Sequence, residues 1–229
     1  MYKRQIYNEY DLRLQIQNHV LSSQKARVAW RLENILSVDD IMYIDAAVNE
    51  VAVDFIIVRP NKGILLLNIF EENLNECTLS EDKKEINVHG QLYQSPIDLI
   101  NLCQLSIKDG IEELLMSTIE DNRNFSLIKK AVVFSENSID EIKKFFEYQN
   151  NVFNFTFIFG KEIIENRDIS QNLYTTIGFL YNNNAFDDVV RRKLARMISP
   201  SWHSYQEGRI DMQPIGAVSY THLRAHETS

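Results

Sequence analysis

The chain is poor in the residue types that cross-link or interrupt a fold. It has two cysteines, four prolines and seven glycines in 229 residues. Cys77 and Cys103 lack CxxC spacing and a neighbouring histidine cluster, so the sequence predicts neither a disulfide framework nor a zinc site. No apolar run approaches the roughly 18 residues of a membrane span, and the N-terminus lacks the charged-then-apolar layout of a signal peptide. We therefore expect a cytoplasmic protein with no membrane partner.

The balance of charge is acidic, with a formal net charge of −8 beside 45% hydrophobic residues. This composition is typical of a globular protein, with room for one large domain or a domain with a helical appendage. Binding along a nucleic-acid backbone requires clustered Lys and Arg, so the net charge argues against a long basic groove. One basic cluster is a candidate contact for DNA or a protein partner, with a solvated helix face as the alternative. It consists of Arg191, Arg192, Lys193 and Arg196.

Both ends of the chain have an unusual sequence. Residues 1–5 and 218–228 resemble translations of a transposon-end adapter used in shotgun sequencing libraries, and a natural polar tail is the alternative. We expect residues 1–5 and 218–229 to derive from the adapter, and we leave them out of the fold prediction. Adapter sequence at both ends implies a truncated reading frame.

The remaining chain is expected to combine helices and strands. Apolar spacing without Pro or Gly predicts one long helix or two abutting helices over residues 6–36. Three consecutive strands follow, the last two joined by a tight turn, and then a polar excursion with a small edge hairpin. Ser95 and Pro96 predict a helix start with a serine cap. The expected strands are 41–48, 51–58, 64–70, 127–134 and 152–159, and the later helices are 95–117, 138–148, 170–181 and 185–198, with irregular chain from Ser199 onward.

This order predicts an α/β fold in which one mixed sheet has helices packed on its faces. The apolar segments 64–67 and 131–134 do not alternate with polar residues, which is typical of central strands covered on both sides. Ser138 with Glu141 three residues later predicts a capping box at the start of the 138–148 helix.

The hairpin in the middle of this sheet carries the most specific pattern. Asp54 lies on its first strand, Gly63 opens its second strand, and the Ser95-Pro96 helix start follows. As a set these features resemble the nuclease-related domain (NERD) family, over residues 6–160. The resemblance implies a restriction-endonuclease-like mixed sheet flanked by helices, with extra C-terminal helices.

The resemblance also implies where a catalytic site would lie. In active relatives the second strand of the hairpin ends in Glu-x-Lys, so that two carboxylates hold Mg²⁺ beside a lysine ammonium. In this chain the Glu position holds Asn68 and the Lys position holds Phe70, and neither side chain can supply the missing charge. Two further family positions, a Glu and a Gln, hold Ala52 and Leu99. The site is therefore expected to be degenerate, with Asp54 as a vestigial catalytic and metal-binding residue and no cofactor in this fragment.

These residues also have other interpretations. Asp54 is equally well explained as a strand-edge or turn carboxylate, and Phe70 is better explained by packing. Lys62 or Glu71 could replace the lost groups, which leaves a residual metal-dependent nuclease as an alternative function. Glu33 corresponds to a Glu that relatives place near the site, and an exposed helix residue is the favoured alternative.

Residues 198–212 resemble the linker that leads, in some relatives, into a superfamily 1 DNA helicase motor. The resemblance divides the chain into a nuclease-related domain at 6–165, a helical extension at 166–198 and a linker at 199–217. The motor, with ATP as its cofactor, would lie in the missing part of the parent chain. Our leading hypothesis is a catalytically degenerate accessory domain that positions DNA or a partner in a bacterial DNA-processing protein, most simply a helicase. A protein-interaction domain that never contacts DNA is the non-enzymatic alternative.

Overall fold

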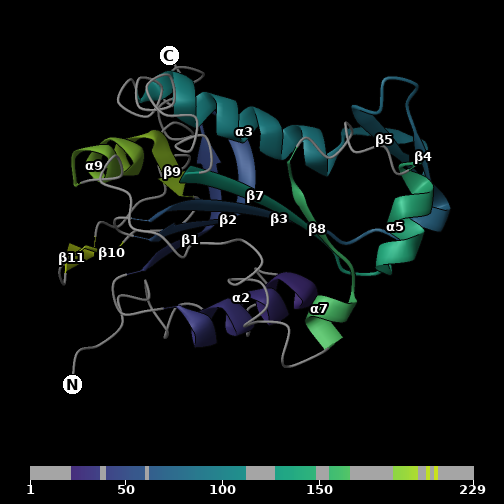
Figure 1. Cartoon of the computed structure of the whole chain (residues 1–229), viewed down its shortest axis with the longest axis horizontal. Coiled ribbons are helices and arrows are strands. Elements are labelled where there is room, and N and C mark those ends of the chain that lie inside the picture. Colours follow the sequence, from purple (N-terminus) through teal and green to yellow (C-terminus); the bar gives the residue numbers. More distant parts are fainter. Residues whose placement is uncertain are drawn as a thin grey trace, which may run out of the picture.

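The computed structural model describes residues 22–36, 40–59, 62–111, 127–147, 155–165, 188–200, 205–206 and 209–210. Figure 1 shows a sheet with helices on both of its faces. The elements follow one another as α2 (Ser23–Ile35), β1 (Ile41–Val48), β2 (Val51–Arg59), β3 (Gly63–Phe70), η1 (Leu74–Glu76), β4 (Cys77–Leu79), β5 (Glu85–Val88), β6 (Gln91–Gln94), α3 (Pro96–Gly110), β7 (Ile128–Phe134), α5 (Ile139–Phe145), β8 (Phe157–Phe159), α7 (Glu162–Glu165), α9 (Asp188–Met197), β9 (Ile198–Pro200), β10 (Tyr205–Gln206) and β11 (Arg209–Ile210).

The main sheet is mixed, with the strand order β8-β7-β3-β2-β1-β9. The pairs β1–β2, β2–β3 and β1–β9 are antiparallel, whereas β3–β7 and β7–β8 are parallel. Parallel neighbours need long crossover connections, and the chain passes through α3 and α5 to make them. The predicted α/β class, with a mixed sheet flanked by helices, is confirmed.

Two hydrophobic layers hold the helices to this sheet. In Figure 1, α3 and α9 lie on one face and α2 and α7 on the other. Along β3, Ile64 and Leu66 pack toward α3, while Leu65 and Leu67 pack toward α2. All four are fully buried, so β3 is the central two-sided strand that its unbroken apolar run predicts. None of the helices in the described ranges is long and apolar enough to cross a membrane.

Gly63 opens β3 because no other residue fits there. Its φ is +138°, a conformation that side chains with a Cβ rarely adopt. A Cβ at this position would lie 2.3 Å from the backbone oxygen of Leu127. The glycine therefore permits both the turn into β3 and the close approach of the chain that enters β7.

The polar excursion after β3 folds into a second, three-stranded sheet of order β4-β5-β6, which includes the expected edge hairpin. Ser95 occupies the N-cap position of α3 with Pro96 behind it, but the serine hydroxyl makes no capping hydrogen bond. The predicted side-chain cap is therefore wrong. Ser95 is held instead by its backbone N–H, which donates to the Lys84 carbonyl at 2.6 Å, and Pro96 has no N–H to be capped.

The C-terminal half confirms some predictions and corrects others. The capping box of Ser138 and Glu141 is present. Of the strand expected at 152–159, residues 152–154 lie outside the described residues, Phe155 has a φ of 57° and lies in a turn, and Phe157–Phe159 form β8. The irregular chain expected from Ser199 is wrong: Ile198–Pro200 form β9, which pairs with β1 and covers a strand edge that would otherwise be open. The first two residues of the expected linker thus belong to the sheet.

Several predictions fall outside the described residues. They include the helical segments expected at 6–21, 112–117 and 170–181 and both segments that resemble adapter sequence.

Candidate functional site

Asp54 lies where β1 and β2 lose their regular alternation. The β1–β2 register places Asp45 opposite Asp54. Side chains two residues apart on a strand normally share a face. Here the pair before Asp45–Asp54, Ile44–Phe55, packs toward α2, whereas the pair after it, Ala46–Val53, packs toward α3. Asp45 has a φ of 47°, which is uncommon for a residue with a side chain, and the break lets both carboxylates reach the α2 side.

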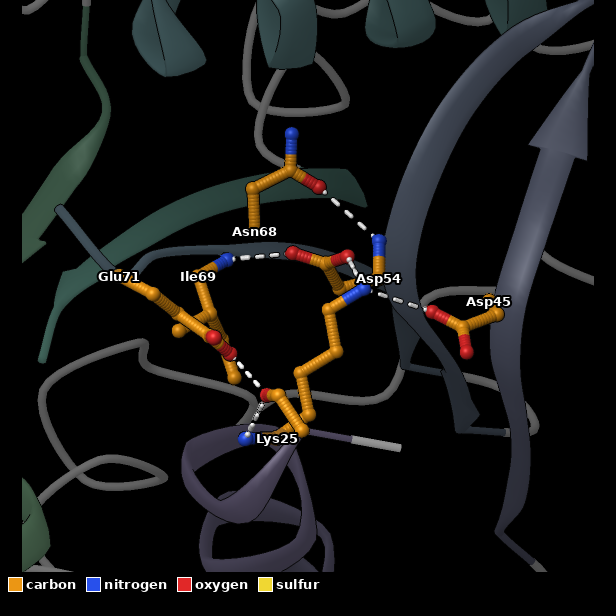
Figure 2. Close-up of polar contacts among 7 residues, drawn as sticks. Lys25, Asp45, Asp54, Asn68, Ile69 and Glu71 are labelled. Carbon is orange, nitrogen blue, oxygen red and sulfur yellow. Dashed lines mark hydrogen bonds and ion pairs between the residues drawn. The ribbon is translucent and has the colours of Figure 1, made fainter. Parts of the chain in front are cut away.

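Lys25 comes from the first turn of α2 and bridges these two carboxylates (Figure 2). Its Nζ lies 2.6 Å from Asp54 Oδ1 and 2.8 Å from Asp45 Oδ1. Ser22 caps the same helix, since its hydroxyl accepts a hydrogen bond from the Lys25 N–H at 3.1 Å. That hydroxyl also donates to the Glu71 carboxylate. The N-terminal turn of α2 is thus tied to the sheet at two places.

Asn68 supports Asp54 from the other side of the strand. Its Oδ1 accepts a hydrogen bond from the Asp54 N–H at 3.0 Å, and Asp54 Oδ2 accepts one from the Ile69 N–H at 2.6 Å. The regular β2–β3 pairing stops one residue earlier, so the amide continues it as a substitute for a backbone carbonyl. Figure 2 shows the Asn68 amide and the Lys25 ammonium on opposite sides of β3. The hairpin places Asp54 and Asn68 on adjacent strands, as its turn and spacing predict.

Phe70 does not join this cluster. Alternation along β3 directs residues 68 and 70 toward α3 and residue 69 toward α2. The Phe70 ring packs against Phe134, with ring centroids 5.4 Å apart. The single pocket expected from positions 54, 68 and 70 does not form, because the Asp54 carboxylate turns to the opposite face from the other two side chains. Packing, the favoured alternative for Phe70, describes it correctly.

Burial and charge oppose each other in the Lys25 cluster. Burial lowers the pKa of Lys25, but the Asp54 and Asp45 carboxylates outweigh it and hold that pKa above its usual value. Burial raises the pKa of Asp54, and Lys25 and the Ile69 N–H counteract only part of this effect. Lys25 is therefore firmly protonated, and one ammonium serves two carboxylates of which at least one is costly to keep charged.

The residues that could replace the lost Glu and Lys of the family site do not lie at Asp54. Lys62 adjoins Gly63 at the far end of the hairpin, and five residues of extended strand, at about 3.3 Å each, separate that end from Asp54. It cannot reach the carboxylate. Glu71 contacts Ser22 and not Asp54. Glu33 lies in α2, and its side chain is outside the described part of the structure.

The basic cluster lies on the opposite face of the sheet from Lys25. Its helix, α9, buries Val190 and Leu194 in the core layer shared with α3, whereas α2 covers the other face (Figure 1). Arg192 and Arg196 are exposed, and the two remaining basic residues are partly exposed. The Asp54 site and the cluster therefore do not form one surface. The cluster comprises Arg191, Arg192, Lys193 and Arg196.

The hairpin residues do not fit the Mg²⁺ ion that the family resemblance implies for active relatives. Magnesium prefers octahedral coordination by carboxylate, carbonyl and water oxygens. Both Asp54 oxygens already accept from Lys25 and Ile69, and the Asn68 oxygen accepts from the Asp54 backbone. Among the described residues, no group of three or more His, Cys, Asp or Glu side chains could hold a metal ion.

Lys25 and Asp45 were not singled out by sequence reasoning. Asp45 gives a weak signal, since it is the only charged residue in the apolar segment 41–48. Ser22, a residue type favoured at helix N-caps, precedes Lys25 by three positions. Neither signal shows that the start of this helix docks on that strand.

Comparisons with known proteins do not add a family to this geometry. No protein-family model, no curated protein and no solved structure matches the chain. The functional interpretation therefore depends on the contacts of the described residues.

Proposed function

We propose that this chain contains a nuclease-related domain that has lost its chemistry and positions DNA or a protein partner within a DNA-processing protein. The support is the hairpin in which Asp54 and Asn68 are adjacent, together with the mixed sheet around it. The similarity of residues 198–212 to a helicase linker is the basis for proposing a helicase motor in the same parent chain. Extending the genomic sequence beyond the adapter-like ends tests that part, and an unrelated downstream reading frame would contradict it.

The observation that carries the loss of chemistry is that both Asp54 carboxylate oxygens and the Asn68 amide oxygen are already engaged within the protein. Asp54 is bound to Lys25 and to the Ile69 N–H, and Asn68 is bound to the Asp54 backbone. A nuclease of this type needs oxygen ligands free to hold a dication and an ammonium free to face the scissile phosphate. Here the ammonium and the carboxylate neutralise each other.

DNA contact is proposed for the outer face of α9. Arg192 and Arg196 are exposed and one helical turn apart, which places both charges on one face. Contact with phosphates must show a salt dependence, so DNA affinity should be titrated across a salt series. We expect the double variant Arg192→Gln with Arg196→Gln to weaken DNA binding. The slope of log affinity against log salt concentration should become shallower by about one to two. The matched control is Lys143→Gln with Lys144→Gln, two exposed charges on α5.

An equal loss in both double variants would show attraction of DNA to positive charge in general and no dedicated contact on α9, and no salt slope in the unmodified chain would favour the protein-interaction alternative. In that case α9 would remain a basic face without a nucleic-acid role.

A residual metal-dependent nuclease is the second candidate. The observation in its favour is that Asp45 and Lys25 supply a second carboxylate and an ammonium beside Asp54, from positions other than those expected. A magnesium-dependent cleavage assay on plasmid and single-stranded DNA separates the two functions, with Asp54→Ala as the test and Asp98→Ala, on α3, as the control. Cleavage that is lost in Asp54→Ala but kept in Asp98→Ala would establish nuclease activity. Equal cleavage by all three proteins would exclude a nuclease that depends on Asp54.

A further inference from the structure

The Asp45–Lys25–Asp54 cluster has a property that holds whatever family the chain belongs to. Two carboxylates face each other across adjacent strands, and one ammonium lies 2.6 and 2.8 Å from their oxygens. Two carboxylates that can contact the same cation attract cations from solution, since ionised oxygens are the ligands that divalent ions prefer. The chain itself supplies the cation that occupies the space between them (Figure 2).

Three features hold the ammonium in place. Lys25 lies in the first, capped turn of α2, which fixes the direction from which its side chain approaches the two carboxylates. The Ser22–Glu71 contact ties that turn to the end of β3. The side chains of Lys25 and Asp54 are 25% and 18% exposed, so solvent screens the pair only in part.

We propose that Lys25 is a built-in counter-ion that keeps the Asp45–Asp54 pair closed to divalent metal ions. A metal ion must break two ion pairs and lose part of its own hydration shell before it gains the same carboxylates. The ammonium has no translational freedom to lose, because it belongs to the chain and acts at a high effective concentration. The arrangement is an internal block on metal binding, and it does not depend on the nuclease-related function proposed for the domain.

Titration with Mn²⁺, followed by the electron paramagnetic resonance signal of the free ion, tests this proposal. Lys25→Gln removes the charge and keeps a side chain of similar reach. Lys83→Gln is the matched control, because Lys83 pairs with the single, exposed carboxylate of Glu147 at 3.2 Å. We expect Lys25→Gln to bind Mn²⁺ at least about tenfold more tightly than the unmodified chain, with a Kd of roughly 10⁻³ M or weaker, because two carboxylates offer fewer ligands than the weak Ca²⁺ sites that reach about 10⁻⁴ to 10⁻³ M. Adding Asp54→Asn should abolish the gain, and Lys83→Gln should show none.

Equal Mn²⁺ affinities for the unmodified chain and a folded Lys25→Gln variant would overturn the proposal. A second measurement on the unmodified chain covers the case in which the variant does not fold. The Lys25 ammonium should give a side-chain ¹H–¹⁵N signal, assigned by its loss in Lys25→Arg, that excess Mg²⁺ leaves unchanged. Saturable movement of that signal with Mg²⁺ would show displacement of the ammonium and would also overturn it. Neither measurement uses DNA, so failure of the counter-ion proposal is distinguishable from failure of the proposed function.

Discussion

Removing the charge of Lys25 should destabilise the fold more than removing any exposed ion pair. Lys25→Met keeps most of the apolar stem of the side chain and deletes the ammonium. Asp54 then loses its ion pair with Lys25 and keeps the Ile69 N–H as a partner on that side, and Asp45 loses its contact with the same ammonium. Deleting one partner costs more than the pair contributes, because a partly buried charge is left unpaired.

The size of the effect follows from the burial of the pair. Breaking a fully buried pair costs about 3–5 kcal/mol, and exposed pairs contribute about 0–1 kcal/mol. With side chains 18–25% exposed, the Lys25 cluster lies between these limits. We expect the free energy of unfolding to fall by about 2–3 kcal/mol, which lowers Tm by roughly 5–10 °C for a chain of this size.

A double-mutant cycle in urea measures the coupling directly. The four proteins are the unmodified chain, Lys25→Met, Asp54→Asn and the double variant, with Lys83→Met as a control whose single carboxylate partner, Glu147, is 75% exposed. We expect a coupling energy of about 1–3 kcal/mol between Lys25 and Asp54 and a loss under about 1 kcal/mol for Lys83→Met.

The pH dependence of the Lys25→Met deficit separates charge from packing. Burial already raises the pKa of Asp54, and loss of the ammonium raises it further. Protonation of Asp54 as the pH falls below neutrality therefore relieves the unpaired charge, and the deficit should shrink. A deficit that is under about 0.5 kcal/mol at pH 7, within the range of unremarkable surface substitutions, would refute the reasoning. A deficit unchanged at acidic pH would assign the loss to packing of the lysine stem.

Three further substitutions test the packing around the sheet. Gly63→Ala should cost more than about 3 kcal/mol in denaturant unfolding, because its Cβ would meet the Leu127 carbonyl at 2.3 Å, and a near-neutral result would contradict the turn geometry. Asn68→Leu should cost about 1–3 kcal/mol and accelerate hydrogen exchange at the Asp54 amide, which loses its acceptor; unchanged exchange would show that the contact is dispensable. Burial lowers the pKa of Lys130 to about 8, with Lys108 adding to the effect, so the unfolded chain binds more protons than the folded chain between that pH and the ordinary lysine pKa of 10.5. Stability should therefore rise by about 1–3 kcal/mol from pH 8 to 10.5, and Lys130→Met should abolish most of this rise in matched melts.

The sheet was predictable because its strands are encoded locally. Runs such as residues 64–67 are apolar without interruption, and the turn at Gly63 fixes which residues of β2 and β3 become neighbours. The pairing of β9 with β1 was not predictable, because Ile198–Pro200 carries no alternating pattern and forms its edge contact with residues far away in sequence. The side-chain cap at Ser95 also failed: the serine hydroxyl is buried and makes no capping hydrogen bond, and the residue is held through its backbone N–H by the Lys84 carbonyl.

The candidate site shows why strand spacing alone could not describe its chemistry. A hairpin register determines which residues are opposite each other, but the face on which they lie changes wherever alternation breaks. Here the break occurs at Asp45, which has a left-handed φ. Aspartate tolerates this conformation better than most residues, and the sequence gives no other sign of it. Once the break turns Asp54 toward α2, its carboxylate leaves the side of Asn68 and Phe70 and meets Lys25. One strained residue therefore decides whether this hairpin presents a pocket or an internal ion pair, and the Lys25 substitutions test that consequence directly.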